Sequence, residues 1–289
     1  MTQSPLQAAP FEVVADGGLD RFPSLLNGVR VAPFSISFGS QTFSAADLSR
    51  ADFFKRLRQG TPHPTTSQPT PEQFRELFEQ SPAEVLAVTI SQGLSGSLNA
   101  ATQALSLISK KVTLHSSGTL SAAQAFQVHA AMMARSKGQS MATAVDWMKK
   151  VHQQTELFFT IDTLEYLRRG GRIGRVQATL GGLLNLKPII TVDKATGTYS
   201  NVGRARSWEK AIEGIAALVT SKHGKGTPLR VGLLYGEETE GANLLLERLK
   251  EHHPILWNDL APVGVALAVH TGPRAVGLAV AAGPWPWEG

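Results

Sequence analysis

The sequence predicts an α/β protein of two domains, and three observations support this fold class. The length of 289 residues fits one large domain or two ordinary ones. Hydrophobic residues make up 42% of the chain and charged residues 18%, so the chain can bury a sizeable core. Short apolar runs alternate with segments of helical periodicity, which is the pattern of strands that alternate with helices.

The first half of the chain predicts a largely parallel sheet. The opening residues 1–10 read as a flexible tail. Strands are then expected at residues 11–15, 28–38, 84–90 and 111–115. The last two are rich in Val, Leu and Ile, as buried parallel strands are. Apolar residues recur with helical spacing at 97–109, 121–137 and 141–153. This order predicts an N-terminal α/β domain over residues 11–155 with right-handed crossovers.

The second half predicts an α+β domain over residues 156–289 with a mixed or antiparallel split sheet. Strands are expected at 156–161, 187–193, 198–203, 228–234, 263–269 and 277–281. Helices are expected at about 175–184, 207–219 and 241–251. The turn Lys194-Ala195-Thr196-Gly197 between two of the strands favours a hairpin. The domain boundary is placed near residue 155, to within about ten residues.

Composition and motifs exclude several classes of protein. The chain has no cysteine, which excludes disulfides and thiolate metal sites and fits a reducing, cytoplasmic compartment. No stretch approaches about 18 consecutive apolar residues, so no membrane insertion is expected. The net charge of +5 is mildly basic and does not demand nucleic acid. Phosphate-loop, dinucleotide and metal motifs are missing, so neither a cofactor nor a metal is expected.

The segment 65–73, TTSQPTPEQ, contains the start of a helix and an unexplained polar triplet. Thr70 can cap a helix that begins at Pro71, and Gln73 completes a capping box. This explanation leaves the triplet at 66–68 in a loop upstream. Ordinary loop polarity is the simpler interpretation of the triplet, and a binding role is the alternative.

The segment 91–97, SQGLSGS, joins a buried strand to an amphipathic helix, where ligands bind in open α/β sheets. The N–H groups and partial positive charge at a helix start suit an anion. The hydroxyls of Ser95 and Ser97 would add donors to such a site. The alternative is simple N-capping, which needs only one of the two serines.

A serine hydrolase is the second hypothesis for the same segment. The residues around Ser95 nearly match the nucleophile elbow G-x-S-x-G, although position 97 is Ser where the motif has Gly. Asp162 or Asp193, followed by His270, would complete the chain order Ser, Asp, His. A chain with eight histidines meets such an order easily by chance.

Two later segments also contain candidate residues. In LEYLRRGGRIGR, residues 164–175, a short helix is expected to end at a Gly-Gly pair, and four arginines lie within eight residues. This turn is either a solvated basic surface or a contact for an acidic ligand or an acidic protein. His270 follows the strand expected at 263–269, so it is either a structural hydrogen-bonding residue or a side chain facing a cleft between the domains.

In chain order, four blocks of this sequence resemble the DegV family of bacterial fatty-acid-binding proteins. The blocks are TTSQPTPEQF, TISQGLSGSLNAA, TLEYLRRGGRIGRVQATLGGLLNLKPII and HTGPRAVGLA. The resemblance runs from about residue 11 to residue 282, and the block at 164–190 is the most specific. It implies a protein that is not an enzyme, with a long-chain fatty acid between its two domains and the tail of the acid inward.

At the matching positions, the resemblance implies that the hydroxyls of Thr66, Ser67 and Ser95 hold the carboxylate of the fatty acid. His270 lies nearby, and Ser97 stands at the same helix start. Physical chemistry agrees with this assignment. Burial of the acyl chain is favourable, and the hydroxyls supply the hydrogen bonds that a buried carboxylate needs. A third hypothesis, a protein-interaction subunit whose cleft is filled by side chains, is also considered.

The resemblance further implies a partner for some members, a separate fatty acid kinase that converts the bound acid into an acyl phosphate. Arg172, with Arg169 and Arg175, is the expected interface with such a partner. A charge reversal at Arg172 would then leave fatty-acid affinity nearly unchanged. Two positions depart from the family pattern, because the expected Asp-Ser pairs are Asp16-Gly17 and His115-Ser116 here. The first departure removes a hydroxyl near the expected head-group region.

Overall fold

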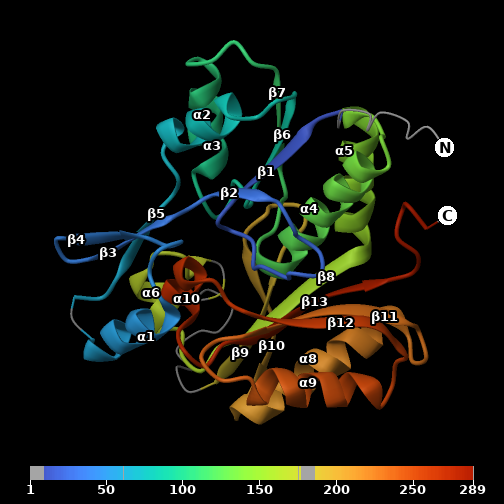
Figure 1. The fold of residues 1–289 in the computed structure, drawn as a ribbon. Helices are drawn as coiled ribbons and strands as arrows, with labels where there is room; N and C mark the ends of the chain where they lie inside the picture. The colour runs from blue at the N-terminus through green and yellow to red at the C-terminus, as the bar shows by residue number, and fades with distance from the viewer. Residues whose placement is uncertain (1–9, 61, 175, 177–185, 289) are drawn as a thin grey trace.

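The computed structural model describes residues 10–60, 62–174, 176 and 186–288 (Figure 1). The tail expected at 1–10 lies outside the described residues except for Pro10, and Arg175 lies outside them as well. The helix expected at 175–184 lies outside them except for Val176.

The N-terminal half contains the predicted parallel sheet. Its strands are paired in the order β2-β1-β6-β7, and every pairing is parallel. The strands are β1 (Glu12–Asp16), β2 (Arg30–Ala32), β6 (Val85–Thr89) and β7 (Val112–Ser116). Helices α2 (Pro71–Glu79) and α3 (Ser97–Leu105) share one core cluster with Val85 and Ala87, whereas α4 (Ser121–Ser136) shares another with Leu86 and Val88. Because both faces of β6 are covered, its sequence is apolar throughout.

The C-terminal half contains the predicted mixed sheet, in the order β10-β9-β8-β13-β11-β12. Only β11 and β12 pair in parallel among its described strands. Helices α8 (Trp208–His223) and α9 (Glu240–Lys250) cover one face, below the sheet in Figure 1. The strands are β8 (Thr155–Thr160), β9 (Lys187–Val192), β10 (Tyr199–Ala205), β11 (Leu229–Tyr235), β12 (Ile255–Pro262) and β13 (Val276–Ala282).

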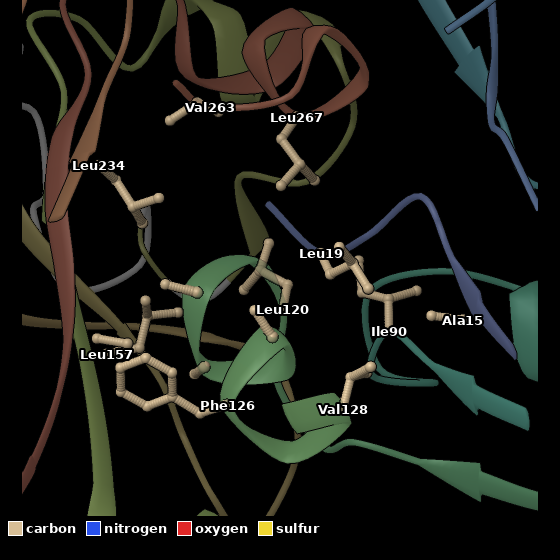
Figure 2. Packing of buried hydrophobic residues seen from close by; sticks show 14 of the residues in the cluster. Ala15, Leu19, Ile90, Leu120, Phe126, Val128, Leu157, Leu234, Val263 and Leu267 are labelled. Carbon is tan, nitrogen blue, oxygen red and sulfur yellow. The ribbon is translucent and has the colours of Figure 1, made fainter. Parts of the chain in front are cut away.

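Helix α4 lies between the two sheets. It packs on β1 and β6 of the parallel sheet and on β8, β11 and β13 of the mixed sheet, while α5 (Met141–Gln154) packs beside it. The sequence of α4 is small or apolar on nearly all sides, which is typical of a helix that is buried all round. Figure 2 shows Phe126 and Val128 of α4 between side chains from both halves of the chain. The division into domains near residue 155 stays a prediction.

One expected strand is wrong. Residues 263–269 form most of helix α10 (Val265–Thr271) instead of a strand. A short apolar run has the same pattern in a buried strand and in a buried helix, so its composition cannot separate the two. The turn at Gly264 and the positive φ of 75° at Gly272 set the two ends of this helix. His270 therefore lies in the last turn of a helix and not after a strand.

Several elements were not expected from the sequence. The region 28–38 is divided between β2 and β3 (Ser35–Phe38), with Pro33 between them, where no N–H is available for pairing. Strand β3 joins β4 (Gln41–Ser44) and β5 (Thr65–Ser67) in a small antiparallel sheet, so the polar triplet begins in a strand and not in a loop. Helix α1 (Arg50–Gln59) and edge strand β12 were also missed. The capping box of Thr70 and Gln73 is confirmed.

Candidate functional site

Three of the predicted ligand-binding residues meet at one small cavity. Thr66 lies on β5, Ser95 precedes α3, and His270 lies on α10, so the fold brings together residues far apart in the sequence. The cavity has a volume of about 30 Å³, and its wall also includes Gln68, Arg172, Tyr199 and Leu267. We call it the head cavity, because its polar side chains suit the polar end of a ligand.

Thr66 and His270 form a direct pair across the head cavity. The Thr66 hydroxyl lies 2.9 Å from Nε2 of His270, and the imidazole is only 8% exposed. Its other nitrogen, Nδ1, is buried and has no hydrogen-bond partner among the described residues. Gly170, which ends α6 (Glu165–Arg169), lies against this nitrogen, and any added Cβ there would collide with it. The packing of Gly170 therefore fixes the position of the imidazole.

The protonation state of His270 follows from this packing. Burial is the main cause that lowers the pKa of His270 to about 3, and the nearby charges of Arg172 and His63 lower it further. The imidazole is therefore neutral at physiological pH, and its two nitrogens offer one donor and one acceptor. In the neutral form, Nε2 can donate to an anion or accept from the Thr66 hydroxyl.

Ser95 forms the second polar edge of the site, whereas Ser97 lies behind it and outside the wall of the head cavity, so the predicted role of Ser97 stays a prediction. Their hydroxyls lie 3.2 Å apart, and Ser97 is fully buried at the start of α3. Gly96 occupies the N-cap position, so no side chain of a capping residue closes this helix. The side chain of Gln68 covers Gly96 so closely that a Cβ there would lie 2.7 Å from its Nε2. The Ser95 hydroxyl accepts the N–H of Ser97 at 3.3 Å, so Ser95 holds the helix start beside the head cavity.

Ser67 lies differently from its neighbour. Thr66 and Ser67 are consecutive in strand β5, so their side chains point to opposite faces. Thr66 bonds to His270, whereas Ser67 is exposed and pairs with Ser35 of β3. The wall of the head cavity contains Thr66 and Gln68 but not Ser67. The predicted role of Ser67 in binding the carboxylate stays a prediction.

The basic turn after α6 separates into two parts. Arg168 and Arg169 both bond to the carboxylate of Glu165, with nitrogen–oxygen distances of 2.7 Å and 2.5 Å. Arg172 lies beyond Gly170, donates to the Gly170 carbonyl at 2.6 Å, and lines the head cavity. Arg172 thus places a positive charge at the head cavity, whereas Arg168 and Arg169 share one carboxylate, that of Glu165.

An apolar cavity of about 30 Å³ adjoins the head cavity. We call it the tail cavity; it lies among Leu120, Leu157, Leu234, Val263 and Leu267, which Figure 2 labels beside the start of α4. Its lining is nearly all apolar. Tyr199 and Leu267 belong to the walls of both cavities. No pattern in the sequence marks Tyr199 as a site residue, because tyrosine is common at the start of a strand.

A buried carboxylate links α10 to α4 beside the tail cavity. Asp20 is 1% exposed and accepts from the Gly264 N–H at 2.6 Å and from the hydroxyl of Ser121. Ser121 has a φ of +61°, a positive value that no other non-glycine residue in the described part of the chain has. Arg50 donates to the carbonyls of Val263 and Gly236. These bonds hold the start of α10, the helix that presents Leu267 and His270.

The geometry gives no support to the hydrolase alternative. Nε2 of His270 bonds to Thr66, and its Nδ1 has no carboxylate partner among the described residues. A triad needs such a carboxylate to orient the imidazole. Asp162 instead pairs with Lys187 at 2.8 Å. In the described ranges there is also no group of three or more His, Asp or Glu side chains that could hold a metal.

The contact between Gly170 and His270 makes a prediction. In Gly170→Ala, the added Cβ would push the imidazole out of its buried position, so the pKa of His270 should rise from about 3 toward its ordinary value near 6.5. NMR titration of the imidazole measures this pKa. Gly171→Ala is the control, because its Cβ meets no atom within 4 Å although its φ is +68°. A His270 pKa that is unchanged in Gly170→Ala would contradict the packing argument.

The whole chain is similar to proteins of one family. The sequence model of the DegV family, described as uncharacterised proteins, matches residues 10–283. A DegV domain-containing protein of Deinococcus radiodurans is 58% identical over 280 residues, which cover 96% of this chain and 98% of that protein. No helix in the described part of the chain is both long and apolar enough to cross a membrane.

Solved structures show the same fold. A DegV family protein from Thermus thermophilus, described by its fatty acid binding, superposes with a TM-score of 0.86 at 30% identity, covering 94% of this chain and 99% of its own. The fatty acid kinase B3 protein of Streptococcus pneumoniae, loaded with linoleic acid, superposes with a TM-score of 0.82 at 20% identity, covering 94% of this chain and 99% of its own. The second likeness concerns the fold alone.

Proposed function

The chain belongs to the DegV family, and from this premise we propose that it binds one long-chain fatty acid. The carboxylate would lie in the head cavity and the acyl chain in the tail cavity. The observation that carries the proposal is the adjacency of a polar cavity and an apolar cavity that share Tyr199 and Leu267. The fatty-acid binding of the Thermus thermophilus relative supports the same assignment.

The polar groups of the head cavity meet the needs of a carboxylate. A buried carboxylate is costly unless several donors bond to it. Thr66, Ser95, Gln68 and neutral His270 can each donate, and Arg172 adds a positive charge at the cavity wall. Charge-assisted hydrogen bonds of this kind are about twice as strong as neutral ones. We therefore propose Thr66 and Ser95 as the main ligands of the carboxylate. His270 is oriented by its hydrogen bond with Thr66.

The apolar cavity supplies the affinity. Burying a methylene group contributes about 0.8 kcal/mol, so a tail of roughly fifteen methylenes gains about 12 kcal/mol before the cost of association. The two cavities together are much smaller than such a chain. The walls must therefore separate when the acid binds, and α10 and β10, which contribute Leu267 and Tyr199, are the elements that border both cavities. The small volume of the two cavities also favours the alternative hypothesis, a protein-interaction subunit that binds no ligand.

We also propose that the head end of the site faces a fatty acid kinase protein. A phosphoryl donor must reach the carboxylate while the acyl chain stays buried. Arg172 lies at that end of the site and is exposed, so it can contact both the carboxylate and a partner. Arg169 is exposed on the same turn. The role of Arg175 in this interface stays a prediction, because Arg175 lies outside the described residues.

Alanine substitutions test the ligand residues. Ser95→Ala and Thr66→Ala should each weaken the binding of palmitate or oleate by about 1–3 kcal/mol, because a buried acceptor loses a donor. Isothermal titration of delipidated protein measures the affinity. Ser67→Ala is the matched control for Thr66→Ala, since the two hydroxyls lie on opposite faces of β5. Unchanged affinity in both Ser95→Ala and Thr66→Ala would place the carboxylate elsewhere, and a protein that takes up no fatty acid would support the interaction-subunit alternative.

A further inference from the structure

Tyr199 stands where the head cavity and the tail cavity meet. It belongs to both walls, and the other residue common to both is Leu267 of α10. Tyr199 opens β10 and pairs with Val192 of β9, so its backbone is fixed in the mixed sheet. Its ring contacts that of Phe159 edge to face, with 5.5 Å between the ring centroids. The ring therefore lies against Phe159 in the wall that the two cavities share.

The Tyr199 hydroxyl makes no side-chain hydrogen bond within the described ranges, and its oxygen is not fully buried although the side chain is only 6% exposed. A tyrosine hydroxyl in a mostly buried side chain usually has a partner. Burial raises the pKa of Tyr199, the positive charge of Arg172 lowers it, and the negative charge of Asp20 raises it further, so the phenol lies within the fields of both charges. Arg172 itself lines the head cavity. The phenol is therefore a donor available to a ligand in the wall that the two cavities share.

We propose that Tyr199 is a specificity-determining residue that recognises fatty acids unsubstituted beside the carboxylate. This inference rests on the proposed function. The hydroxyl of Tyr199 donates to the ligand carboxylate as an additional partner. Once the walls separate, the ring and Leu267 flank the first methylenes of the chain closely on either side. A substituent on the carbon next to the carboxylate would lie between these two side chains and collide with the ring.

The proposal separates a polar effect from a steric effect. Tyr199→Phe keeps the ring and removes the donor, so it should weaken the binding of every fatty acid by about tenfold. Tyr199→Leu removes the flat ring but keeps an apolar side chain, so it should relieve the collision with a substituted acid. An added methyl group in a tight apolar site changes affinity by about tenfold or more. Tyr235→Phe is the matched control, because Tyr235 lines neither cavity.

The experiment compares palmitate with 2-methylpalmitate by competition against a fluorescent fatty acid. The wild type and Tyr199→Phe should both prefer palmitate by about tenfold, and Tyr199→Leu should lose most of that preference. Tyr199→Ala provides a second enlarged variant, and the melting temperature shows which variants are folded. A wild type that binds both acids equally, or a folded Tyr199→Leu and Tyr199→Ala that keep the full preference, would overturn the proposal. A wild type that binds neither acid would overturn the proposed function instead.

Discussion

Arg172→Glu is expected to lower the affinity for a long-chain fatty acid by roughly tenfold to a hundredfold. The side chain lies in the wall of the head cavity, so the substitution would put a second carboxylate beside that of the ligand. Like charges brought together at a binding site cost several kcal/mol, and solvent screens part of this because Arg172 is exposed. From the sequence alone, a charge reversal at Arg172 would be expected to leave the affinity for the fatty acid nearly unchanged. The position of Arg172 in the cavity wall predicts a loss of affinity instead.

Binding titrations at low and high salt measure this effect. The loss in Arg172→Glu should shrink as the salt concentration rises, since screening weakens repulsion between exposed charges. Arg168→Glu is the control, because Arg168 bonds to Glu165 and lies outside the wall of the head cavity. Equal affinities of Arg172→Glu and the wild type would assign Arg172 to the partner interface alone. Acyl-phosphate formation with a candidate kinase then measures that second role.

Asp20→Asn is expected to remove a large pH dependence of stability. Burial raises the pKa of Asp20 from an ordinary value near 3.8 to about 6, although bonds from Ser121 and Gly264 and the charge of Arg50 lower it. The folded protein therefore binds the proton more tightly than the unfolded chain does. The stability contributed by this proton is fully present below about pH 4 and is lost as the pH rises through about 6.

The size of the effect follows from the shift in pKa. A shift from 3.8 to about 6 corresponds to about 3 kcal/mol. The free energy of unfolding of the wild type, relative to Asp20→Asn, should fall by about this amount between pH 4 and pH 8. Urea denaturation across that range measures both proteins, and taking the difference cancels the titration of the other carboxylates. A difference that stays constant with pH would show that Asp20 titrates normally.

The sequence was most informative where local patterns determine structure. The apolar run at 84–90 predicted a buried strand because both faces of β6 are covered, and Thr70 with Gln73 predicted a capping box because its bonds are local. The run at 263–269 failed because a seven-residue apolar segment carries no periodicity that separates a strand from a helix. The difference mattered, because His270 faces the head cavity from a helix.

The parts of the site that depend on packing could not be predicted. The family resemblance pointed to Thr66, Ser95 and His270 and implied that Arg172 lies close to the carboxylate end, but it did not place Arg172 in the cavity wall itself. Nothing local in the sequence marks Tyr199, because its position between two cavities depends on α10 and β10 together. Likewise, the linkage of α10 to α4 through Asp20 joins residues 244 positions apart in the chain.

Native mass spectrometry of the purified protein, followed by denaturing lipid extraction, tests the central claim most directly. The account predicts a single adduct per chain with the mass of a long-chain fatty acid, and the same acid in the extract. Delipidated wild type should regain the adduct with added palmitate or oleate, and the Arg172→Glu variant should regain less of it. A protein that carries no lipid and takes up neither acid would contradict the account.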